Sequence, residues 1–571
     1  MALLAVSRRA MFVGAASIAI AVVALARAIV TLDYRLTYVA DVANRAASRP
    51  YRLAGLWAQM AGSLLLFAAL AAIAGTWGAR IVRRRAPALV PVTMAFAATV
   101  AAGLAMISRL AADPFARLRQ PAIDGAGLTP ILEHWAMLVH PPLLYVGLVA
   151  TVPLASMAVA AWWTGADDAE WRPAAHVVAA GGWTVLTLAL ALGGRWAYAE
   201  VGWGGFWAWD PVENGGLLVW LALLVVLHRT RRTPGTVRSA KLAGAAWATF
   251  AAAVLGVLIT RSGAAASVHA FGEATRVGRA LSALAIVVLI MSGIARWRWT
   301  RRAPLGELAL APSAGSAVAP STTSSAAPAV IERLLGLQQL VTSVVIVVVG
   351  VGTLYPVVGR WIDGRRRVVD ARFYTASISP LAAVAAAGIV VTLVRTRQWW
   401  RRGALAFAHI GMLVFLAGAI ATSLGRDRST IVAPGGSTRI AGHELIIGQP
   451  VAREHSRYRL IAVPIMVRDD GGEVARLTPA LRVYETAGLV LPETALRSTL
   501  AGDLQVSVRR VDERGDVTID VHVRPLAWLV WLGALLIVAG GLAALIPAVV
   551  SHRVHAAPPV PNDPAAIGGH R

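Results

Sequence analysis

Residues 202–214 read GWGGFWAWDPVEN and separate two long apolar runs. The stretch places three tryptophans within the eight residues that end at Asp210, namely Trp203, Trp207 and Trp209. The ends of transmembrane helices often carry one or two tryptophans, but this stretch adds glycines, a proline and two carboxylates. Indole faces stack on flat rings, and glycine leaves the backbone open to close approach. We therefore expect a surface for a planar macrocycle, with an ordinary aromatic belt as the alternative.

The chain around this stretch is too apolar for a water-soluble protein. Of its 571 residues, 57% are hydrophobic and 15% are charged, and the mean hydropathy is +0.63. Apolar runs long enough to cross roughly 30 Å of hydrocarbon occur at 10–31, 52–77, 89–108, 138–161, 176–194, 213–229, 243–261, 277–295, 336–358, 377–394, 403–424 and 526–549. The sequence predicts an all-α polytopic membrane protein of about 12 transmembrane helices.

The net charge of +24 indicates how the spans are oriented in the membrane and that the chain contacts lipid, rather than a nucleic-acid partner. Its basic residues gather in short loops between the apolar runs, at Arg8–Arg9, Arg83–Arg85, Arg229–Lys241, Arg296–Arg302 and Arg395–Arg402. The positive-inside rule places these loops and both termini in the cytoplasm, although Arg365–Arg367 then falls outside. The tryptophan-rich stretch is therefore predicted to be extracytoplasmic. The chain has no cysteine and cannot form a disulfide or act as a thiol reductant.

A second, smaller unit is predicted near the C-terminus. Residues 426–524 contain short stretches of alternating polarity, such as Leu504–Val508 and Val517–Val523, separated by glycine-containing turns. Period-two alternation with such turns is typical of β-strands. We expect a small extracytoplasmic β-rich domain just before the last transmembrane helix.

The expected organisation follows in chain order. It consists of a transmembrane bundle over 1–302 with the tryptophan-rich block at 195–214, a disordered cytoplasmic linker over 303–330, further transmembrane helices over 331–425, the β domain over 426–524, the last helix over 525–550 and a cytoplasmic tail over 551–571.

Four histidines lie at helix ends or inside apolar runs, at two depths of the membrane. His140 and His269 are on the predicted outer side and flank the tryptophan-rich stretch, while His228 and His409 are toward the cytoplasm. Two imidazoles on opposite faces of an iron porphyrin give bis-His ligation. A single histidine can also bond a backbone carbonyl or line a water-filled cavity, and His134 is a rival outer ligand.

Other charged and imidazole groups have weaker interpretations. Arg195 and Arg261 suit a carboxylate such as a porphyrin propionate, although a snorkelling interfacial arginine is the alternative for each. The histidines of the β domain, His443, His455 and His522, are expected at its surface.

Several blocks of the chain, taken together, resemble the CcmF family of cytochrome c-type biogenesis proteins, which share a tryptophan-rich "WWD" loop. The blocks are YRLAGLW with GSLLL (51–66), DGAGLTPIL to HPPLLYVG (124–147), RWAYAEVGWGGFWAWDPVENGGLLVWL (195–221), TRSGAAASVHAF (260–271), GTLYP (352–356), AHIGMLVFLAG (408–418) and RPLAWLVWLGALL (524–536). They occur in the same order and cover most of the chain.

The resemblance implies a haem lyase in the bacterial cytoplasmic (inner) membrane. Members of the family accept haem from the chaperone CcmE and join its vinyl groups to the thiols of a CXXCH motif in apocytochrome c, together with CcmH/CcmI-like thioredoxin and chaperone subunits. On matching motifs, His140 and His269 are the axial ligands of the transferred haem. Trp203, Trp207, Trp209 and Asp210 hold the edge of this substrate porphyrin.

The inner pair has its own role in the resemblance. His228 and His409 correspond to the bis-His ligands of a resident transmembrane haem b, which passes electrons from quinol to the incoming haem iron. The chain departs from the family at 59–61, where Gln59, Met60 and Ala61 replace a His-Glu pair, and it is one helix shorter at the N-terminus. The competing functions are a haem exporter that forms no covalent bond and a structural scaffold.

Overall fold

A computed structural model of the chain describes residues 2–554, apart from 201, 232–240, 262–274, 303–325, 366, 396–402, 456–457, 470–471 and 486–487. Within these residues, 12 helices are long and apolar enough to cross a membrane. All twelve predicted spans are therefore confirmed, and the chain is a multi-pass membrane protein. The predicted linker 303–330 lies mostly outside the described residues, and the part from Ala326 onward is helical.

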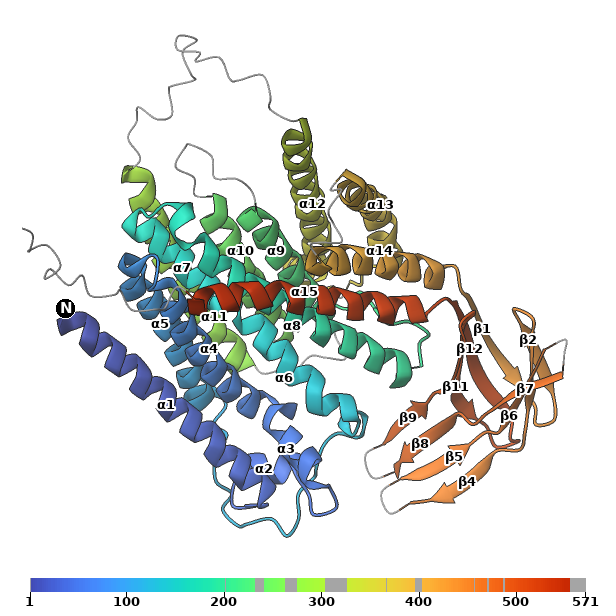
Figure 1. Cartoon of the computed structure of the whole chain (residues 1–571). Coiled ribbons are helices and arrows are strands. Elements are labelled where there is room, and N and C mark those ends of the chain that lie inside the picture. The colour runs from blue at the N-terminus through green and yellow to red at the C-terminus, as the bar shows by residue number, and fades with distance from the viewer. Residues whose placement is uncertain are drawn as a thin grey trace, which may run out of the picture.

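The helical part of the chain forms one bundle (Figure 1). Its helices are α1 (Ala2–Val30), α2 (Thr37–Val42), α3 (Arg49–Ala58), α4 (Met60–Val82), α5 (Val90–Ala111), α6 (Trp135–Val149), α7 (Thr151–Thr164), α8 (Asp168–Glu200), α9 (Pro211–Arg231), α10 (Lys241–Arg261), α11 (Thr275–Arg302), α12 (Ala326–Asp363), α13 (Ala371–Arg395), α14 (Gly403–Ser423) and α15 (Trp528–Val554).

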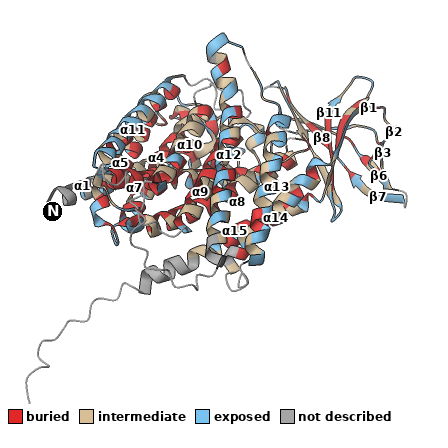
Figure 2. Cartoon of the chain, turned by 90° about the horizontal axis from the view of Figure 1, so that it is seen from above, coloured by how far each residue is buried: buried red, intermediate tan, exposed pale blue. Residues whose placement is uncertain are grey.

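The apolar core of the bundle lies among α4, α5, α7, α8, α9 and α10. Figure 2 shows buried positions concentrated on these helices and exposed positions along the outer face of α11. That face carries large apolar side chains such as Val287, Leu289 and Ile290, each about half exposed. A helix that is apolar on both its inner and outer faces is typical of a membrane span that contacts lipid.

Helices α14 and α15 pack against each other more closely than ordinary side chains allow. A Cβ added at Gly411 would lie 2.7 Å from the backbone nitrogen of Ile537, and one added at Gly418 would lie 2.6 Å from that of Val530. Small residues at one helix face let the two backbones approach, which is the usual way that helices associate in lipid. The two helices that flank the β domain are thereby joined along their length.

The second predicted span is divided in the structure. Instead of one helix over 52–77, α3 ends at Ala58 and α4 begins at Met60, because Gln59 has extended backbone angles. The YRLAGLW block therefore forms a short helix outside the span, and its Trp57 Nε1 donates to the Met137 carbonyl of α6 at 2.9 Å.

The β-rich unit before the last helix is confirmed, with strands over 426–525. They are β1 (Arg426–Val432), β2 (Ser437–Ile440), β3 (His443–Ile447), β4 (Val451–Glu454), β5 (Arg459–Ala462), β6 (Ile465–Asp469), β7 (Gly472–Leu477), β8 (Ala480–Tyr484), β9 (Leu489–Glu493), β10 (Ala495–Ser498), β11 (Gly502–Val511) and β12 (Val517–Pro525).

The described strands form three antiparallel sheets of four strands, ordered β1-β12-β11-β10, β2-β3-β6-β7 and β4-β5-β8-β9. The alternating side chains of β3, β6, β11 and β12 meet in a core that includes Leu445, Val467, Val506, Ile519 and Val521. The β domain sits at the end of the bundle where α14 ends and α15 begins (Figure 1).

Candidate functional site

The tryptophan loop, defined here as residues 202–210, connects α8 to α9. The loop is shorter than the predicted tryptophan-rich block at 195–214, because α8 continues to Glu200 and α9 begins at Pro211. Asp210 caps α9: its Oδ1 accepts from the Val212 amide at 2.8 Å. Glu213 Oε2 reaches back to the amides of Ala208 and Asp210 at 2.9 and 3.3 Å. This reciprocal capping fixes how the loop enters the helix.

Trp209 is held in a strained conformation at the end of the loop. Its φ of +58° lies in the left-handed region, which is costly for a bulky residue. Its indole stacks on Tyr374 of α13 with ring centroids 4.8 Å apart and an interplanar angle of 4°. The fully buried Asn214 donates to the Trp209 carbonyl and to Thr353 Oγ1 of α12, both at 3.1 Å. Strain that is maintained by neighbours in this way is typical of functional sites.

The other aromatic side chains of the loop face different neighbours. Trp207 meets Trp209 edge to face at 6.4 Å, and its buried Nε1 has no hydrogen-bond partner among the described residues. Phe206 contacts Phe415 of α14 at 6.2 Å and Trp531 of α15 at 6.1 Å. The loop is therefore anchored by α12, α13, α14 and α15, and Trp207 retains a free donor.

Gly202 and Gly204 of the loop let the β domain approach the loop backbone, whereas the sequence led us to expect a planar macrocycle there. A Cβ added at Gly202 would lie 3.0 Å from Ser507 of β11, and one added at Gly204 would overlap the His522 ring of β12. Both glycines also have positive φ, +72° and +78°. The expectation was wrong because the close partner of these glycines lies some three hundred residues away in the sequence.

Hydrogen bonds from the β domain hold the loop backbone. Ser507 Oγ donates to the Gly202 carbonyl at 3.2 Å, and His522 Nε2 lies 3.3 Å from the same oxygen. Arg524 Nε donates to the Gly204 carbonyl. We call Ser507, His522 and Arg524 the loop clamp. His522 is only 8% exposed, so its predicted surface position was wrong.

An exposed carboxylate, that of Asp427, orients two side chains of the loop clamp. Asp427 of β1 accepts from Arg524 at 2.5 Å and lies 2.7 Å from His522 Nδ1. Burial raises the pKa of Asp427, but the hydrogen bonds and charges of His522 and Arg524 outweigh it and hold that pKa below its usual value. The charged carboxylate is thus the form that matches the docked β domain.

The end of α8 adds a second contact with the β domain. Tyr198 donates its hydroxyl to Asp503 Oδ2 at 3.0 Å, and Gln505 donates to the Tyr198 carbonyl. Trp531 lies edge-on to the Tyr198 ring at 5.7 Å. The loop and the β domain therefore lie on the same side of the bundle.

His140, the predicted outer ligand, lies on α6 against α8. Its Nδ1 is 2.8 Å from the Ala189 carbonyl, and Trp196 approaches its ring edge-on at 6.2 Å. A carbonyl at Nδ1 selects the tautomer whose Nε2 carries the lone pair, as in metal-ligating histidines. His269, the other predicted outer ligand, lies outside the described residues.

His134, the rival outer ligand, has a structural role. Its Nδ1 accepts from the Ala136 amide at 3.2 Å and caps α6. Its ring stacks on Trp196 at 5.9 Å, and Nε2 lies 3.5 Å from Glu200. Burial lowers the pKa of His134, so the neutral form that caps the helix is favoured.

The inner pair of histidines lies on two helices that are not packed closely together. His228 is near the end of α9 and His409 near the start of α14, close enough that a charge on one imidazole would be felt by the other. Among the described residues, α9 and α14 share few close backbone approaches. The buried His228 Nδ1 atom makes no well-formed hydrogen bond among the described residues, and the nearest backbone acceptor is that of Leu224, one turn earlier on α9. Two neighbouring imidazoles on different helices of the membrane bundle are the kind of residues that could ligate a planar iron group.

The two candidate arginines differ in their surroundings. Arg261 is 2% exposed and donates to Ser63 Oγ at 2.9 Å and to Met60 Sδ at 3.1 Å. Arg195 lies 5.7 Å from the Trp531 ring centroid, and its buried Nη1 has no partner in the described part of the chain. Of the two, Arg195 retains a donor for a carboxylate ligand.

The DGAG motif is structural. Asp124 accepts from the Tyr34 hydroxyl at 2.6 Å and from the Arg45 amide at 3.0 Å, and so joins two loops. Gly125 lies against the carbonyls of Ala40 and Ala43, where no side chain fits.

Sequence reasoning missed the partners that hold the tryptophan loop. They are Tyr198, Thr353, Tyr374, Asp427, Gln505, Ser507, His522, Arg524 and Trp531. A signal existed for some, because Thr353 lies in the GTLYP block and Arg524 and Trp531 lie in the RPLAWLVW block. Nothing in the sequence indicated that these blocks meet the loop.

Comparisons with known proteins agree on the family. A family model described as cytochrome C assembly protein matches residues 57–265. The chain is 30% identical to the probable cytochrome c-type biogenesis protein NrfE of Escherichia coli K12, over 89% of the chain and 90% of the relative. It is 28% identical to the cytochrome c-type biogenesis protein CycK of Bradyrhizobium diazoefficiens, over 94% and 89% respectively.

A solved structure shares the fold. It is described as cytochrome c heme lyase CcmF and matches with a TM-score of 0.70 at 20% identity, over 94% of this chain and 91% of the other.

Proposed function

We propose that this chain, which belongs to the cytochrome c-type biogenesis family of NrfE, CycK and CcmF, is a haem lyase that attaches haem to apocytochrome c. The observation that carries the proposal is the tryptophan loop, whose backbone is held by the β domain and whose Trp209 is strained against Tyr374. A fixed aromatic loop suits a reaction in which placement of two large reactants supplies most of the acceleration.

The chemistry asked of the site is the addition of a thiol across a vinyl group. The sulfur of each cysteine in a CXXCH motif bonds to one vinyl carbon and its hydrogen ends on the other, so the step needs no oxidant. In this proposal His140, whose Nδ1 lies against the Ala189 carbonyl, and His269 hold the iron of the substrate haem. Trp203, Trp207 and Trp209 orient the porphyrin, and Arg195 pairs with a propionate.

Asp210 has a different task from the one that the resemblance implies. Because Asp210 caps α9, it acts on the porphyrin through the loop rather than by contact. It is a positioning residue in this proposal.

His228 and His409 are proposed to ligate a resident haem b. When bound, such a haem supplies one-electron transfer, with quinol as the donor, and keeps the substrate iron ferrous. The task of this chain is to hold two imidazoles on α9 and α14 at a fixed separation and to exclude water from them. The burial of the His228 Nδ1 atom and the proximity of His409 support this assignment.

The partners and location follow from the same proposal. The haem donor is a CcmE-like chaperone, the second substrate is apocytochrome c, and CcmH/CcmI-like subunits present its reduced thiols. The loop and the β domain face the outside of the bacterial inner membrane.

Covalent attachment in cells separates a lyase from a haem exporter. We expect His140→Ala to abolish holocytochrome c formation, measured by haem staining of the denatured cytochrome, while free haem outside the membrane stays at the wild-type level. The matched control is His455→Ala, an exposed position of the β domain. Wild-type holocytochrome c formation in a variant lacking both His140 and His269 would contradict the lyase assignment.

A further inference from the structure

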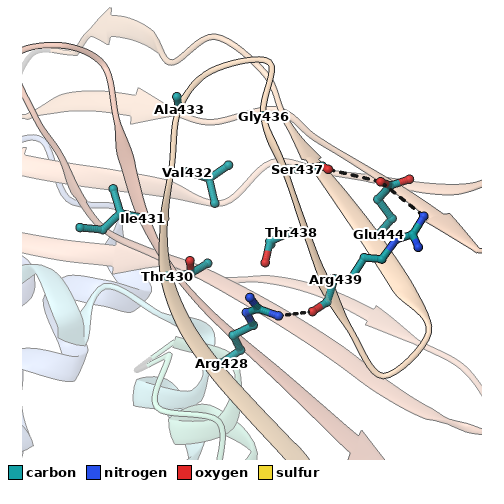
Figure 3. A pocket seen from close by; sticks show the side chains of 10 residues that line it. All are labelled: Arg428, Thr430, Ile431, Val432, Ala433, Gly436, Ser437, Thr438, Arg439 and Glu444. Carbon is teal, nitrogen blue, oxygen red and sulfur yellow. Dashed lines mark hydrogen bonds and ion pairs between the residues drawn. The ribbon is translucent and has the colours of Figure 1, made fainter.

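A polar pocket of about 460 Å³ opens in the β domain between β1 and β2. Its volume lies within the range of roughly 300–1,000 Å³ that is usual for ligand pockets. Figure 3 shows that the two strands are joined by the turn at Ala433–Gly436 and diverge from it. Residues 426–447 are all described, and within them β1 and β2 form no ladder with each other.

Both walls of the pocket are edge strands. Among the described strands, β1 pairs only with β12 and β2 only with β3, so each has one edge without a strand partner. An extended peptide that enters such a gap can pair with an exposed sheet edge through its main chain. Edge strands that carry no such ligand are normally protected by charges or cover.

The side chain of Arg428 bridges the gap between β1 and β2. Its side chain extends from β1 across the pocket, and Nη1 donates to the Arg439 carbonyl of β2 at 2.6 Å (Figure 3). A backbone carbonyl on the free edge of β2 is thus satisfied by a side chain rather than by a neighbouring strand. The Arg439 side chain turns away, toward Glu444 at 3.8 Å.

A buried hydroxyl in the pocket lacks a partner. Thr438 of β2 is 7% exposed, and its Oγ1 makes no hydrogen bond in the described part of the chain. Figure 3 shows the Thr438 side chain directed into the gap, with Thr430 of β1 on the opposite side. An unpaired buried hydroxyl costs free energy unless a ligand satisfies it.

The pocket is coupled to the tryptophan loop through a single strand. Asp427 of β1 holds the loop clamp, and the next residue, Arg428, lines the pocket. Successive side chains of a strand point to opposite faces, so the Asp427 side chain is directed to the loop clamp and the Arg428 side chain to the pocket. A peptide paired with β1 therefore lies next to Asp427, the residue that orients the loop clamp.

We propose that the gap between β1 and β2 binds an extended segment of the polypeptide substrate by strand addition, and delivers it to the tryptophan loop. The inference rests on the proposed lyase function. Main-chain pairing is tolerant of sequence, which suits an enzyme whose substrates share only a short motif. Thr438 and Arg428 are the side chains that meet the bound backbone.

The test uses the full chain in detergent and a fluorescent twelve-residue peptide in which serines replace both cysteines of a CXXCH motif. Fluorescence anisotropy gives Kd without covalent chemistry. We expect Thr438→Val to raise Kd by roughly three- to tenfold, the effect of one hydrogen bond. N-methylation of alternate backbone amides of the peptide should weaken binding at least as much. Arg453→Ala, on the exposed edge strand β4, is the matched control and should leave Kd unchanged.

A second measurement locates the peptide. Because the chain has no cysteine, the single variants Thr430→Cys and Arg453→Cys can each carry one photo-crosslinker. We expect the peptide to be captured from position 430 and not from position 453.

Several results would overturn strand addition. They are wild-type affinity in Thr438→Val, indifference to N-methylation, equal crosslinking from both positions, or binding of inorganic phosphate to the pocket in place of the peptide. Failure of the lyase function has a different signature. The peptide would still bind in a Thr438-dependent way, while the wild-type chain would form no thioether bonds with an intact CXXCH substrate.

Discussion

The two candidate haem regions are stabilised in opposite ways. His228 and His409 lie within membrane spans, on two helices that share few close contacts, and the buried His228 Nδ1 atom makes no well-formed hydrogen bond among the described residues. The tryptophan loop lies at the end of the bundle, and its carbonyls and rings are engaged by two sheet strands and four helices. The inner region fits a ligand that stays and supplies the missing contacts. The outer region is fixed without a ligand, as presentation of a transient substrate requires.

The largest effect on the outer region is expected from Gly204→Ala. The added Cβ meets the His522 ring, and the backbone at φ +78° is unfavourable for alanine. We expect the β domain to separate from the loop and holocytochrome c formation to fall about tenfold or more. Gly181→Ala on α8, where nothing lies within 4 Å, is the control. Normal activity in Gly204→Ala would show that the contact with β12 is dispensable.

Arg524→Lys sharpens the comparison by removing one contact of the loop clamp. Lysine keeps the charge but cannot bond the Gly204 carbonyl and Asp427 together as the guanidinium fork does. We expect the docked state to lose about 1–2 kcal/mol, seen as faster hydrogen exchange over residues 202–210. Arg510→Lys, an exposed position on β11, should not change that exchange. Equal hydrogen-exchange rates in both variants would show that Arg524 does not hold the loop.

Tyr374→Leu tests the stack that holds Trp209. Loss of the parallel ring contact should destabilise the loop conformation by about 0.5–1.5 kcal/mol, measured by near-ultraviolet circular dichroism of the tryptophans. Tyr374→Phe keeps the ring and loses only the hydroxyl that bonds Thr353 and Asn214, so its spectrum should stay closer to wild type. If the two variants behave alike, the stack is not what holds Trp209.

The smallest effect is a pH dependence of docking. The pKa of Asp427 is lowered in the folded chain, so its contribution is fully present above the unfolded value of about 3.9. It is lost as the pH falls through the lowered pKa. The side chain is 61% exposed, which keeps the effect small. Tryptophan fluorescence of the loop should change below about pH 4. Asp427→Asn should lack that change, and persistence of the change would assign it to another group.

How much of this follows from the sequence depends on the range of each interaction. All twelve spans were predictable because hydrocarbon thickness alone sets their length. The division at Gln59 was not, since the YRLAGLW block is apolar enough to continue a span. The sheet pattern of β11 and β12 was evident from alternation.

Long-range contacts account for the errors at the site. Gly202 and Gly204 of the tryptophan loop were assigned to a ring because their actual neighbours, Ser507 and His522, lie far along the chain. Burial of His522 could not be predicted because it depends on how the β domain docks. The role of Asp210 at the porphyrin edge stays a prediction, and the D-P-V-E spacing before an apolar run carries the helix-capping signal that the structure shows. The identity of the histidine pair came from resemblance, and the structure adds that the two imidazoles interact.

The most direct test of the two-region account is the optical spectrum of the purified chain reconstituted with haem. The account predicts a bis-His b-type spectrum that His228→Ala and His409→Ala each abolish. Gly204→Ala should retain that spectrum while failing to form holocytochrome c. A bis-His spectrum that survives both histidine substitutions, or that Gly204→Ala abolishes, would contradict the separation of a resident haem site from the outer loop.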